Sequence, residues 1–216
     1  MKKYELTNDY IYEDNHKLYR IRAIRSFGNL EVHTGDYGGY VESEENLSQS
    51  GNCWIFDRAK AYGDARVYGN AELRDQAKVY DKARIFRDAR ILGYAEVYGE
   101  AKVYDQAEVR GSAGVYDYAK VYENASILDW ANVYEDAKVH GYAVVFGYAS
   151  VYGNANVYDG AEIYNYASVF GYSKVFGEAK VFDDATIYGS AKICGRARVF
   201  YKASLYEKKE FREVEC

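Results

Sequence analysis

The sequence predicts an all-β fold, a parallel solenoid whose coils each have three sides. A six-residue repeat, Ala-x-Val-Tyr-Gly-x, begins at Cys53, and its last copy begins at Ala203, with no insertion between them. Alanine fills 24 of the 26 first positions, and Val, Ile or Leu fills every third position except that of Ala61. Such internal periodicity is typical of architectures in which each repeat packs only on its neighbours.

Each hexad is expected to form one short strand and one corner. Alternate side chains of an extended segment point to opposite faces, so the alanine and the aliphatic residue point inward while their neighbours point outward. The residue after the aromatic position is mostly Gly, Asp or Asn, as in Gly63, Asp81 and Asn165. These residue types tolerate tight turns and positive φ, which a corner requires.

Three hexads are expected to make one coil. Taken at every third hexad, the aromatic position gives an almost pure tyrosine column from Tyr62 to Tyr206, whereas the columns that start at Phe56 and Tyr68 are mixed. Three unlike columns predict a triangular prism of about 8 to 9 coils over residues 53–206. Because adjacent strands lie about 4.8 Å apart, the prism should be roughly 42 Å long.

Residues 1–52 do not follow the period and are expected to form an N-terminal β cap. The runs Tyr10–Tyr12 and Leu18–Ala23 suggest a hairpin that turns at residues 13–16. Residues 207–216, which include Lys208, Lys209 and Arg212, are expected to form a charged C-terminal cap or tail. Caps are expected because the ends of a parallel solenoid expose unpaired backbone groups.

The segment Val67–Glu72 and its copies resemble the hexapeptide repeat of left-handed parallel β-helix proteins. The left-handed sense follows from this resemblance alone. The segments Gly35–Gly39, Glu42–Ser48 and Gly51–Ile55 further resemble a subgroup found in bacteria and their phages, whose members are often labelled as transferases. The resemblance implies a homotrimer and, for many of the enzymes with this fold, acyl transfer from acyl-CoA with a histidine base.

His140 is the candidate base for that chemistry. It replaces an aromatic residue between Tyr122 and Tyr158, with Asp136 close in sequence as an orienting acid. The enzymes of this fold usually extrude a loop from the prism to build the site, and this chain has no such insertion. A surface histidine in place of a tyrosine is the alternative. Three histidines, two of them outside the prism, indicate no zinc site.

A basic ladder is predicted beside one aromatic column, and we interpret the two together as a candidate binding surface. Cations against acidic groups and rings against sugars or bases would suit an anionic polymer or a glycan. Acids lie close upstream at Asp64, Asp81, Glu100, Asp117 and Asp136, so local pairing on a solvated face is the alternative. The predicted ligand-binding residues are Arg66, Arg84, Lys102, Lys120, Lys138, Lys174 and Lys192 with Tyr104, Tyr122 and Tyr158.

An apolar patch is predicted on the later half of the column that starts at Phe56. Large apolar patches usually mark an interface, which favours self-association, although a partner protein or glycan could use the same surface. The predicted interface residues are Leu128, Trp130, Val144, Phe146, Tyr148, Tyr164, Tyr166 and Phe182.

Composition limits the remaining function classes. The chain of 216 residues has no long apolar run and no signal-like start, so a cytoplasmic protein without a membrane span is expected. A net charge of −5 produces no global attraction for nucleic acid or a membrane. We therefore expect a non-catalytic binding or scaffold protein that needs no cofactor or metal, with an acyl-CoA-dependent acyltransferase as the alternative.

Overall fold

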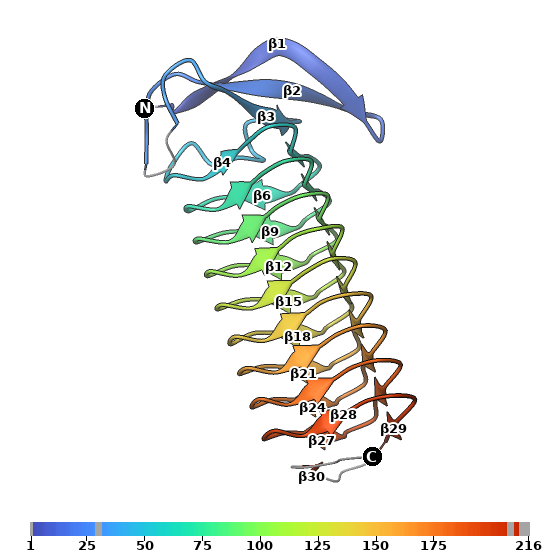
Figure 1. The fold of residues 1–216 in the computed structure, drawn as a ribbon. Coiled ribbons are helices and arrows are strands. Elements are labelled where there is room, and N and C mark those ends of the chain that lie inside the picture. Colours follow the sequence, from blue (N-terminus) through green and yellow to red (C-terminus); the bar gives the residue numbers. More distant parts are fainter. Residues whose placement is uncertain (1, 29–31, 207–209, 212–216) are drawn as a thin grey trace.

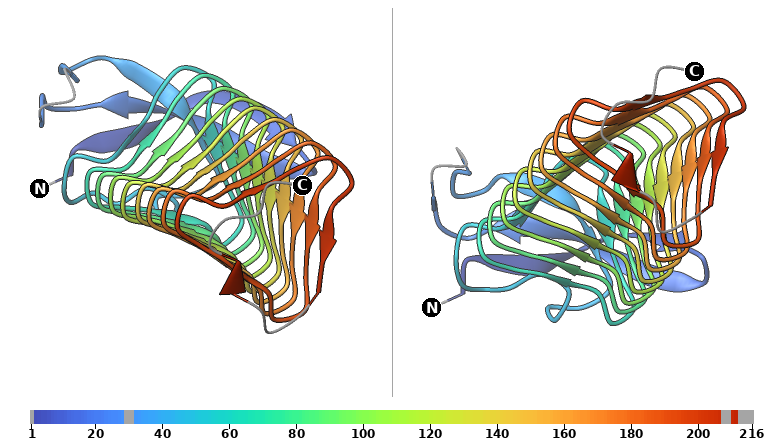
Figure 2. Two further views of the ribbon diagram at one scale, coloured as in Figure 1. Left: turned by 60° about the horizontal axis from the view of Figure 1, so that its bottom comes forward. Right: turned by 90° about the horizontal axis from the view of Figure 1, so that it is seen from below.

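The protein is a rod of stacked three-sided coils with the N-terminal hairpin across one end (Figure 1). The computed structural model describes residues 2–28, 32–206 and 210–211, and none of these residues is helical. The strands form three sheets, one for each side of the coil, which Figure 2 shows along the rod. The all-β, three-sided parallel β-helix is confirmed as a β-solenoid of about nine turns with a β cap.

The first sheet contains every third strand from Trp54 onward. Its members are β4 (Trp54–Ile55), β7 (Glu72–Leu73), β10 (Arg90–Ile91), β13 (Glu108–Val109), β16 (Ser126–Ile127), β19 (Val144–Val145), β22 (Glu162–Ile163), β25 (Lys180–Val181) and β28 (Arg198–Val199).

The second sheet carries the tyrosine column and also includes the three strands of the cap. Its members are β1 (Tyr4–Glu13), β2 (His16–Ala23), β3 (Tyr37–Val41), β5 (Lys60–Ala61), β8 (Lys78–Val79), β11 (Glu96–Val97), β14 (Gly114–Val115), β17 (Asn132–Val133), β20 (Ser150–Val151), β23 (Ser168–Val169), β26 (Thr186–Ile187) and β29 (Ser204–Leu205).

The third sheet carries the basic ladder. Its members are β6 (Arg66–Val67), β9 (Arg84–Ile85), β12 (Lys102–Val103), β15 (Lys120–Val121), β18 (Lys138–Val139), β21 (Asn156–Val157), β24 (Lys174–Val175), β27 (Lys192–Ile193) and β30 (Glu210–Phe211). Residues 207–209 and 212–216, on which most of the predicted C-terminal cap falls, lie outside the described residues.

Successive coils pair in parallel with a shift of three hexads, so equivalent side chains form straight columns. Lys102 pairs with Lys120, for example, and Val103 pairs with Val121. Backbone amides of one coil donate to carbonyl oxygens of the next, as from Lys102 N to Ala119 O at 2.9 Å. The hexad therefore sets both the strand and its register.

The core is a narrow apolar column enclosed by the three sheets. Alanines such as Ala101 and aliphatic residues such as Val103 are fully buried, because both positions of the hexad point inward. Ser173, which replaces alanine in its hexad, is also fully buried, and its hydroxyl donates to Phe170 O at 2.8 Å. A satisfied hydroxyl avoids most of the cost of burying a polar group.

The corners depend on residues in the left-handed backbone region. Asp81, Asp105 and Asp117 have φ of 56°, 60° and 55°, values that residues other than Gly, Asn and Asp seldom adopt. The aspartate of one coil also accepts a hydrogen bond from the corner amide of the next, as Asp81 does from Gly99 at 3.1 Å. The side chain that tolerates the corner therefore also links adjacent coils.

The cap closes the N-terminal end of the core. Trp54 is 1% exposed and meets the rings of Tyr4 and Phe27 edge-on at 6.1 and 5.4 Å. Lys3 is also buried, and its ammonium donates to Cys53 O at 2.7 Å and contacts Cys53 Sγ at 3.2 Å. Burial lowers the pKa of Lys3, even though the neighbouring Cys53 opposes that shift.

Candidate functional site

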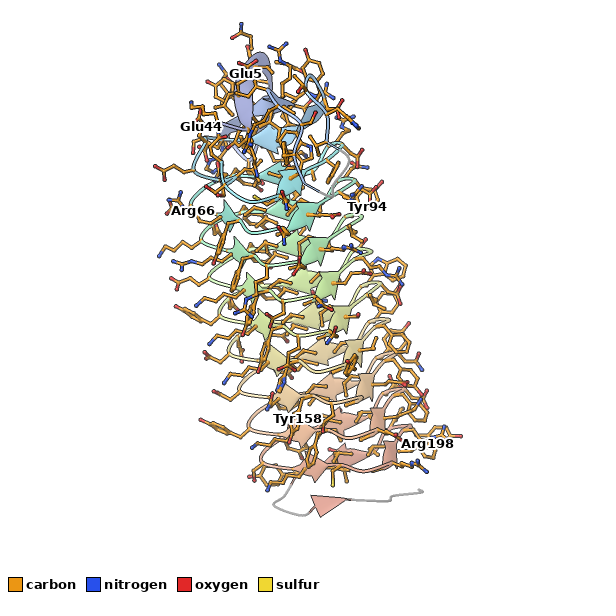
Figure 3. The ribbon with its side chains drawn as sticks, turned by 90° about the vertical axis from the view of Figure 1, so that its left-hand side faces the viewer. Glu5, Glu44, Arg66, Tyr94, Tyr158 and Arg198 are labelled. Atoms are coloured by element: carbon orange, nitrogen blue, oxygen red, sulfur yellow. The ribbon has the colours of Figure 1, made fainter. Side chains whose placement is uncertain are left out.

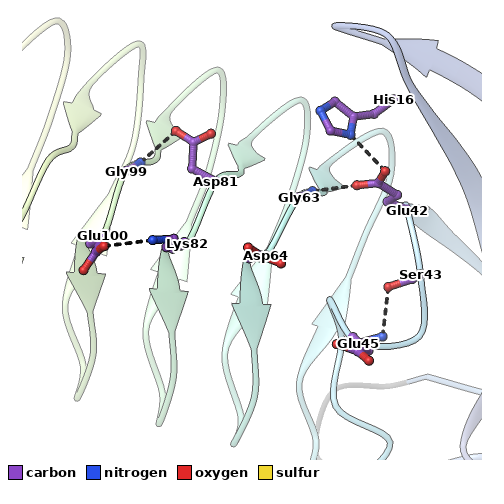
Figure 4. Close-up of a pocket in the computed structure, with 10 residues that line it drawn as sticks. All are labelled: His16, Glu42, Ser43, Glu45, Gly63, Asp64, Asp81, Lys82, Gly99 and Glu100. Atoms are coloured by element: carbon purple, nitrogen blue, oxygen red, sulfur yellow. Dashed lines mark hydrogen bonds and ion pairs between the residues drawn. The ribbon is translucent and has the colours of Figure 1, made fainter.

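A hollow of about 770 Å³ lies where the turn of the hairpin meets the first coils of the solenoid (Figure 4). Its lining comes from the start of β2, the segment after β3, and three successive corners that join the second and third sheets. The lining residues are His16, Glu42, Ser43, Glu45, Gly63, Asp64, Asp81, Lys82, Gly99 and Glu100.

His16 and Glu42 form a hydrogen-bonded pair in this hollow. The His16 Nδ1 atom lies 2.9 Å from Glu42 Oε1, within the range of a charge-assisted hydrogen bond. The second ring nitrogen of His16 points away from Glu42 (Figure 4). The His16 ring also packs on Tyr62, with the ring centroids 5.1 Å apart. This is the arrangement of a base whose ring is oriented by a carboxylate.

Glu42 is held in place by the first corner of the solenoid. Its Oε2 atom accepts a hydrogen bond from Gly63 N at 2.7 Å, as the corner aspartates do farther along the rod. Burial alone would raise the pKa of Glu42, but the hydrogen bonds from His16 and Gly63 outweigh it and lower the pKa. Glu42 therefore stays ionised and can accept a hydrogen bond from the Nδ1–H group of a neutral imidazole. In that tautomer Nε2 carries no proton and can act as the proton acceptor.

The hairpin turn that carries His16 is anchored on the second sheet. Asp14 and Asn15 have φ of 45° and 68°, which allows the tight reversal between β1 and β2. The Asp14 carboxylate accepts a hydrogen bond from the Tyr62 hydroxyl at 2.9 Å. Glu13 lies 2.7 Å from both Lys60 and Lys78. These contacts hold His16 over the corners.

Carboxylates dominate the charge of the hollow. Five acidic residues line it, against one lysine and one histidine, and Lys82 is itself paired with Glu100 at 3.2 Å. No group of three or more His, Cys, Asp or Glu that could hold a metal ion occurs within the described parts of the chain. The hollow is therefore an acidic site with one oriented imidazole.

His140, the base expected from the sequence, lies on the third sheet well inside the aromatic column. Its ring is stacked between Tyr122 and Tyr158, with centroid distances of 4.6 and 5.2 Å. Its Nδ1 atom lies 3.5 Å from Glu123 Oε2, so the nearby acid is Glu123 from the preceding coil rather than the expected Asp136. That distance is longer than an ordinary hydrogen bond.

The basic ladder and the apolar patch lie on separate sheets. The predicted ligand-binding residues share the outer surface of the third sheet, while Leu128, Val144, Phe146, Tyr164 and Phe182 lie along the first sheet. Trp130, Tyr148 and Tyr166 are exposed at the corners beyond the first sheet and stack on one another. Binding at the ladder and homotrimer formation through the patch stay predictions.

The His16–Glu42 pair was not found from the sequence. The two residues are 26 positions apart and both precede the periodic region, so the hexad says nothing of their positions. Glu42 could have been singled out only as a carboxylate in the segment that leads into the first coil.

Comparison with known proteins finds a partial match to a curated bacterial protein. No protein-family model matches the chain. The chain is 37% identical over 82 residues to the uncharacterized acetyltransferase YdcK of Escherichia coli (strain K12). The match covers 34% of this chain and 24% of YdcK, so the chain spans about a quarter of that relative.

The coils and this relative fit the hexapeptide-repeat β-helix, transferase-like family. The resemblance seen in the repeat is thus confirmed for the architecture. Within the described residues, no helix has the length and apolar character that a bilayer-spanning helix needs.

Proposed function

We propose that this protein transfers an acyl group from acyl-CoA to an amine, with His16 as the general base. The observation that carries the proposal is the 2.9 Å contact between His16 Nδ1 and Glu42 Oε1 inside a hollow of about 770 Å³. The partial similarity to a protein named as an acetyltransferase supports the reaction class. We therefore propose acyl transfer in place of the non-catalytic binding or scaffold function expected from the sequence.

The chemistry requires one oriented proton acceptor. As the amine nitrogen attacks the thioester carbonyl, a C–N bond forms and His16 Nε2 takes the proton from nitrogen. The C–S bond then breaks, and the proton on His16 passes to the departing CoA thiolate. Glu42 stabilises the transient imidazolium through Nδ1, and such positioned general bases contribute about 10² to 10⁴-fold to a rate.

His16 fits this role better than His140 for two structural reasons. The His16 ring opens onto a hollow, whereas the ring of His140 is covered on both faces by Tyr122 and Tyr158. The carboxylate of Glu42 is also at hydrogen-bonding distance, whereas Glu123 lies 3.5 Å from His140.

The lining of the hollow favours an acceptor that carries positive charge. Glu42, Glu45, Asp64, Asp81 and Glu100 line the same hollow as His16, and Lys82 is paired with Glu100. A protonated amine is attracted to such a site, and it becomes nucleophilic when it loses its proton. We therefore expect amines with a second cationic group to be better acceptors than neutral alcohols.

Release of the CoA thiol from acetyl-CoA, in the presence of diamines or of alcohols, tests the proposal. His16→Gln is expected to lower turnover about a hundredfold or more, because the proton acceptor is lost. Glu42→Gln keeps an acceptor for Gly63 N and removes the charge, so it tests orientation without loss of the corner contact. His140→Gln is the matched control and is expected to retain wild-type turnover.

Two results would contradict the proposal. Full activity in His16→Gln with loss of activity in His140→Gln would move the base to the third sheet. Absence of acetyl-CoA turnover in the wild type with every amine and alcohol would remove the acyltransferase function itself.

A further inference from the structure

The third sheet presents a straight row of cations, and the last of them, Lys192, lies in register with Glu210 of β30. Arg84, Lys102, Lys120 and Lys138 pair directly in register from rung to rung, and Lys174 pairs with Lys192 after a gap at Asn156. Among the described residues, none of these six cations makes an ion pair; only Arg66, at the first rung, does so, with Glu45. We call these six residues the cation row.

The acids that precede the cation row in sequence have other partners. Asp81 and Asp117 accept hydrogen bonds from the corner amides of Gly99 and Glu135 at 3.1 and 3.2 Å. Glu100 pairs with Lys82. These three acids therefore form no ion pair with Arg84, Lys102 or Lys120.

Three other outward lysines on the solenoid strands are paired. Lys60 and Lys78, at the same hexad position on the second sheet, both contact Glu13, and Lys180 on the first sheet contacts Glu162 at 2.9 Å. The chain as a whole is acidic, with a net charge of −5. The cation row is thus a local concentration of positive charge on an acidic protein.

The cation row costs the folded state energy. Neighbouring like charges about 4.8 Å apart repel by about 1 kcal/mol per pair in water. The repeat accepts neutral or acidic residues at the equivalent position elsewhere, such as Ser150 and Glu162. A repulsive row that the repeat could readily avoid indicates a partner that supplies negative charge.

The aromatic column beside the cation row presents ring edges, not ring faces. Tyr104 and Tyr122 are stacked at 5.0 Å with an interplanar angle of 2°, and Tyr158 stacks on Phe176 at 4.9 Å and 0°. Both faces of an interior ring are therefore covered by its neighbours. Stacking of nucleic-acid bases, which needs open ring faces, is disfavoured here.

The tyrosine hydroxyls remain available as hydrogen-bond donors. Burial raises the pKa of Tyr104, Tyr122 and Tyr158, so the hydroxyls keep their protons at neutral pH. Arg66 and Tyr158, which mark two rungs of this sheet, are labelled in Figure 3. Tyr104 and Tyr122 place hydroxyls beside Lys102 and Lys120, and Tyr158 adds a hydroxyl beside Asn156. Cations with hydroxyls among them match a polymer that carries both acidic groups and hydroxyls.

We propose that the cation row and the aromatic column beside it bind an acidic polysaccharide that lies along the rod. The row from Arg84 to Lys192 covers seven rungs, and the six intervals between them, at about 4.8 Å each, make roughly 29 Å. An extended acidic peptide fits this row less well, because its side chains on one face repeat every two residues, at about 6.7 Å. This binding function is separate from acyl transfer at His16 and does not depend on it.

A single substitution separates binding from folding. In Lys120→Glu, the new carboxylate would lie between Lys102 and Lys138. Repulsion between three neighbouring cations in the folded state is then replaced by attraction between the carboxylate and the two lysines. We expect the melting temperature to rise by about 2 to 4 °C while affinity for a heparin dodecasaccharide falls about tenfold or more. A variant that had lost its structure would show both a lower melting temperature and a lower affinity. A higher melting temperature together with a lower affinity therefore shows that the substitution acts on the binding surface and not on folding.

Arg58→Glu is the matched control. Arg58 is exposed at a corner between the first and second sheets, and the substitution changes the net charge by the same amount. Affinity should be measured by fluorescence anisotropy at about 50 mM and about 200 mM salt, since the electrostatic part of binding weakens with salt. We expect Arg58→Glu to bind heparin as the wild type does.

Three outcomes would overturn the proposal. The first is no heparin binding by the wild type at the lower salt concentration. The second is equal affinity in Lys120→Glu and the wild type. The third is tighter binding of poly(dT) or poly-glutamate than of heparin, which would assign the row to nucleic acid or to an acidic protein.

Discussion

Glu13 lies 2.7 Å from Lys60 and joins the turn of the N-terminal hairpin to the first rung of the second sheet. The same carboxylate is 2.7 Å from Lys78 on the next rung. All three side chains are less than a third exposed, so solvent screens the pairs only partly. This contact fixes the position of His16, three residues farther along the chain, above the hollow.

Glu13→Gln is expected to loosen the hairpin from the solenoid. The substitution leaves the partly buried Lys60 without a carboxylate partner and Lys78 with only Glu96 at 3.5 Å, at a cost of about 1 to 3 kcal/mol. Hydrogen exchange should show faster exchange of the β1 and β2 amides, with no change in coils beyond Tyr98. Glu5→Gln, in the exposed pair with Arg22, is the control and should change stability by less than about 1 kcal/mol.

The same contact gives a defined acid dependence. Burial by itself would raise the pKa of Glu13, but hydrogen bonds from Lys60 and Lys78 outweigh burial and lower it. A carboxyl group with a lowered folded-state pKa contributes its stability above its ordinary pKa of 4.5, and the contribution is lost as pH falls below that value. Hairpin exchange that is equally slow in Glu13→Gln and the wild type at neutral pH would contradict this role for Glu13.

The corner residues provide a second prediction. Gly141 has φ of 72°, and a Cβ atom there would lie 2.7 Å from the backbone nitrogen of Asp159. Asparagine occupies the same hexad position at Asn165, on another corner of the coil, with φ of 59°, so Gly141→Asn is expected to cost less than about 1 kcal/mol. Gly141→Val places a β-branched side chain in the left-handed region and should cost about 1 to 3 kcal/mol more.

Chemical denaturation of the two variants checks this prediction. Equal losses in Gly141→Asn and Gly141→Val would show that crowding against Asp159, not backbone conformation, limits the corner. A loss confined to the valine variant would support the conformational explanation.

The solenoid could be predicted from the sequence because one local rule decides each of its strands. The alternation that buries Ala101 and Val103 and turns the half-buried Lys102 and Tyr104 outward repeats along the hexads, so the register follows from counting. The three-hexad spacing also correctly predicted the columns. The pattern that defines each strand lies within six residues and recurs along the chain, so the strands can be assigned without knowledge of distant contacts.

The candidate site could not be predicted in this way. The contact between His16 and Glu42 depends on how a hairpin folds back over a solenoid, and no period relates the two residues. The partner of Asp81 also differs from the local ion pair that sequence proximity suggested. The positive-φ corner directs the Asp81 carboxylate to the amide of Gly99. Contacts made across the cap, or set by a corner, need the three-dimensional arrangement.

Alkaline unfolding is expected from the tyrosine column. Tyr134 is stacked between Tyr116 and Tyr152 at 4.9 and 4.8 Å. Burial and, to a smaller extent, the neighbouring Tyr152 and Tyr116 raise the pKa of Tyr134 to about 12 from its ordinary value of 10.0. A phenol with a raised folded-state pKa contributes stability below pH 10, and the contribution is lost as pH rises toward 12.

Phenolate absorbance and circular dichroism, followed together through an alkaline titration, measure this effect. Because the pKa values of Tyr98, Tyr116 and Tyr152 are also raised, we expect these phenols to ionise only as the coils unfold, so both signals should change together. Tyr134→Phe keeps the stacked ring and removes the hydroxyl, so its unfolding should begin at higher pH than in the wild type. Ionisation of all tyrosines near pH 10 with the coils intact would contradict a buried, mutually stacked column.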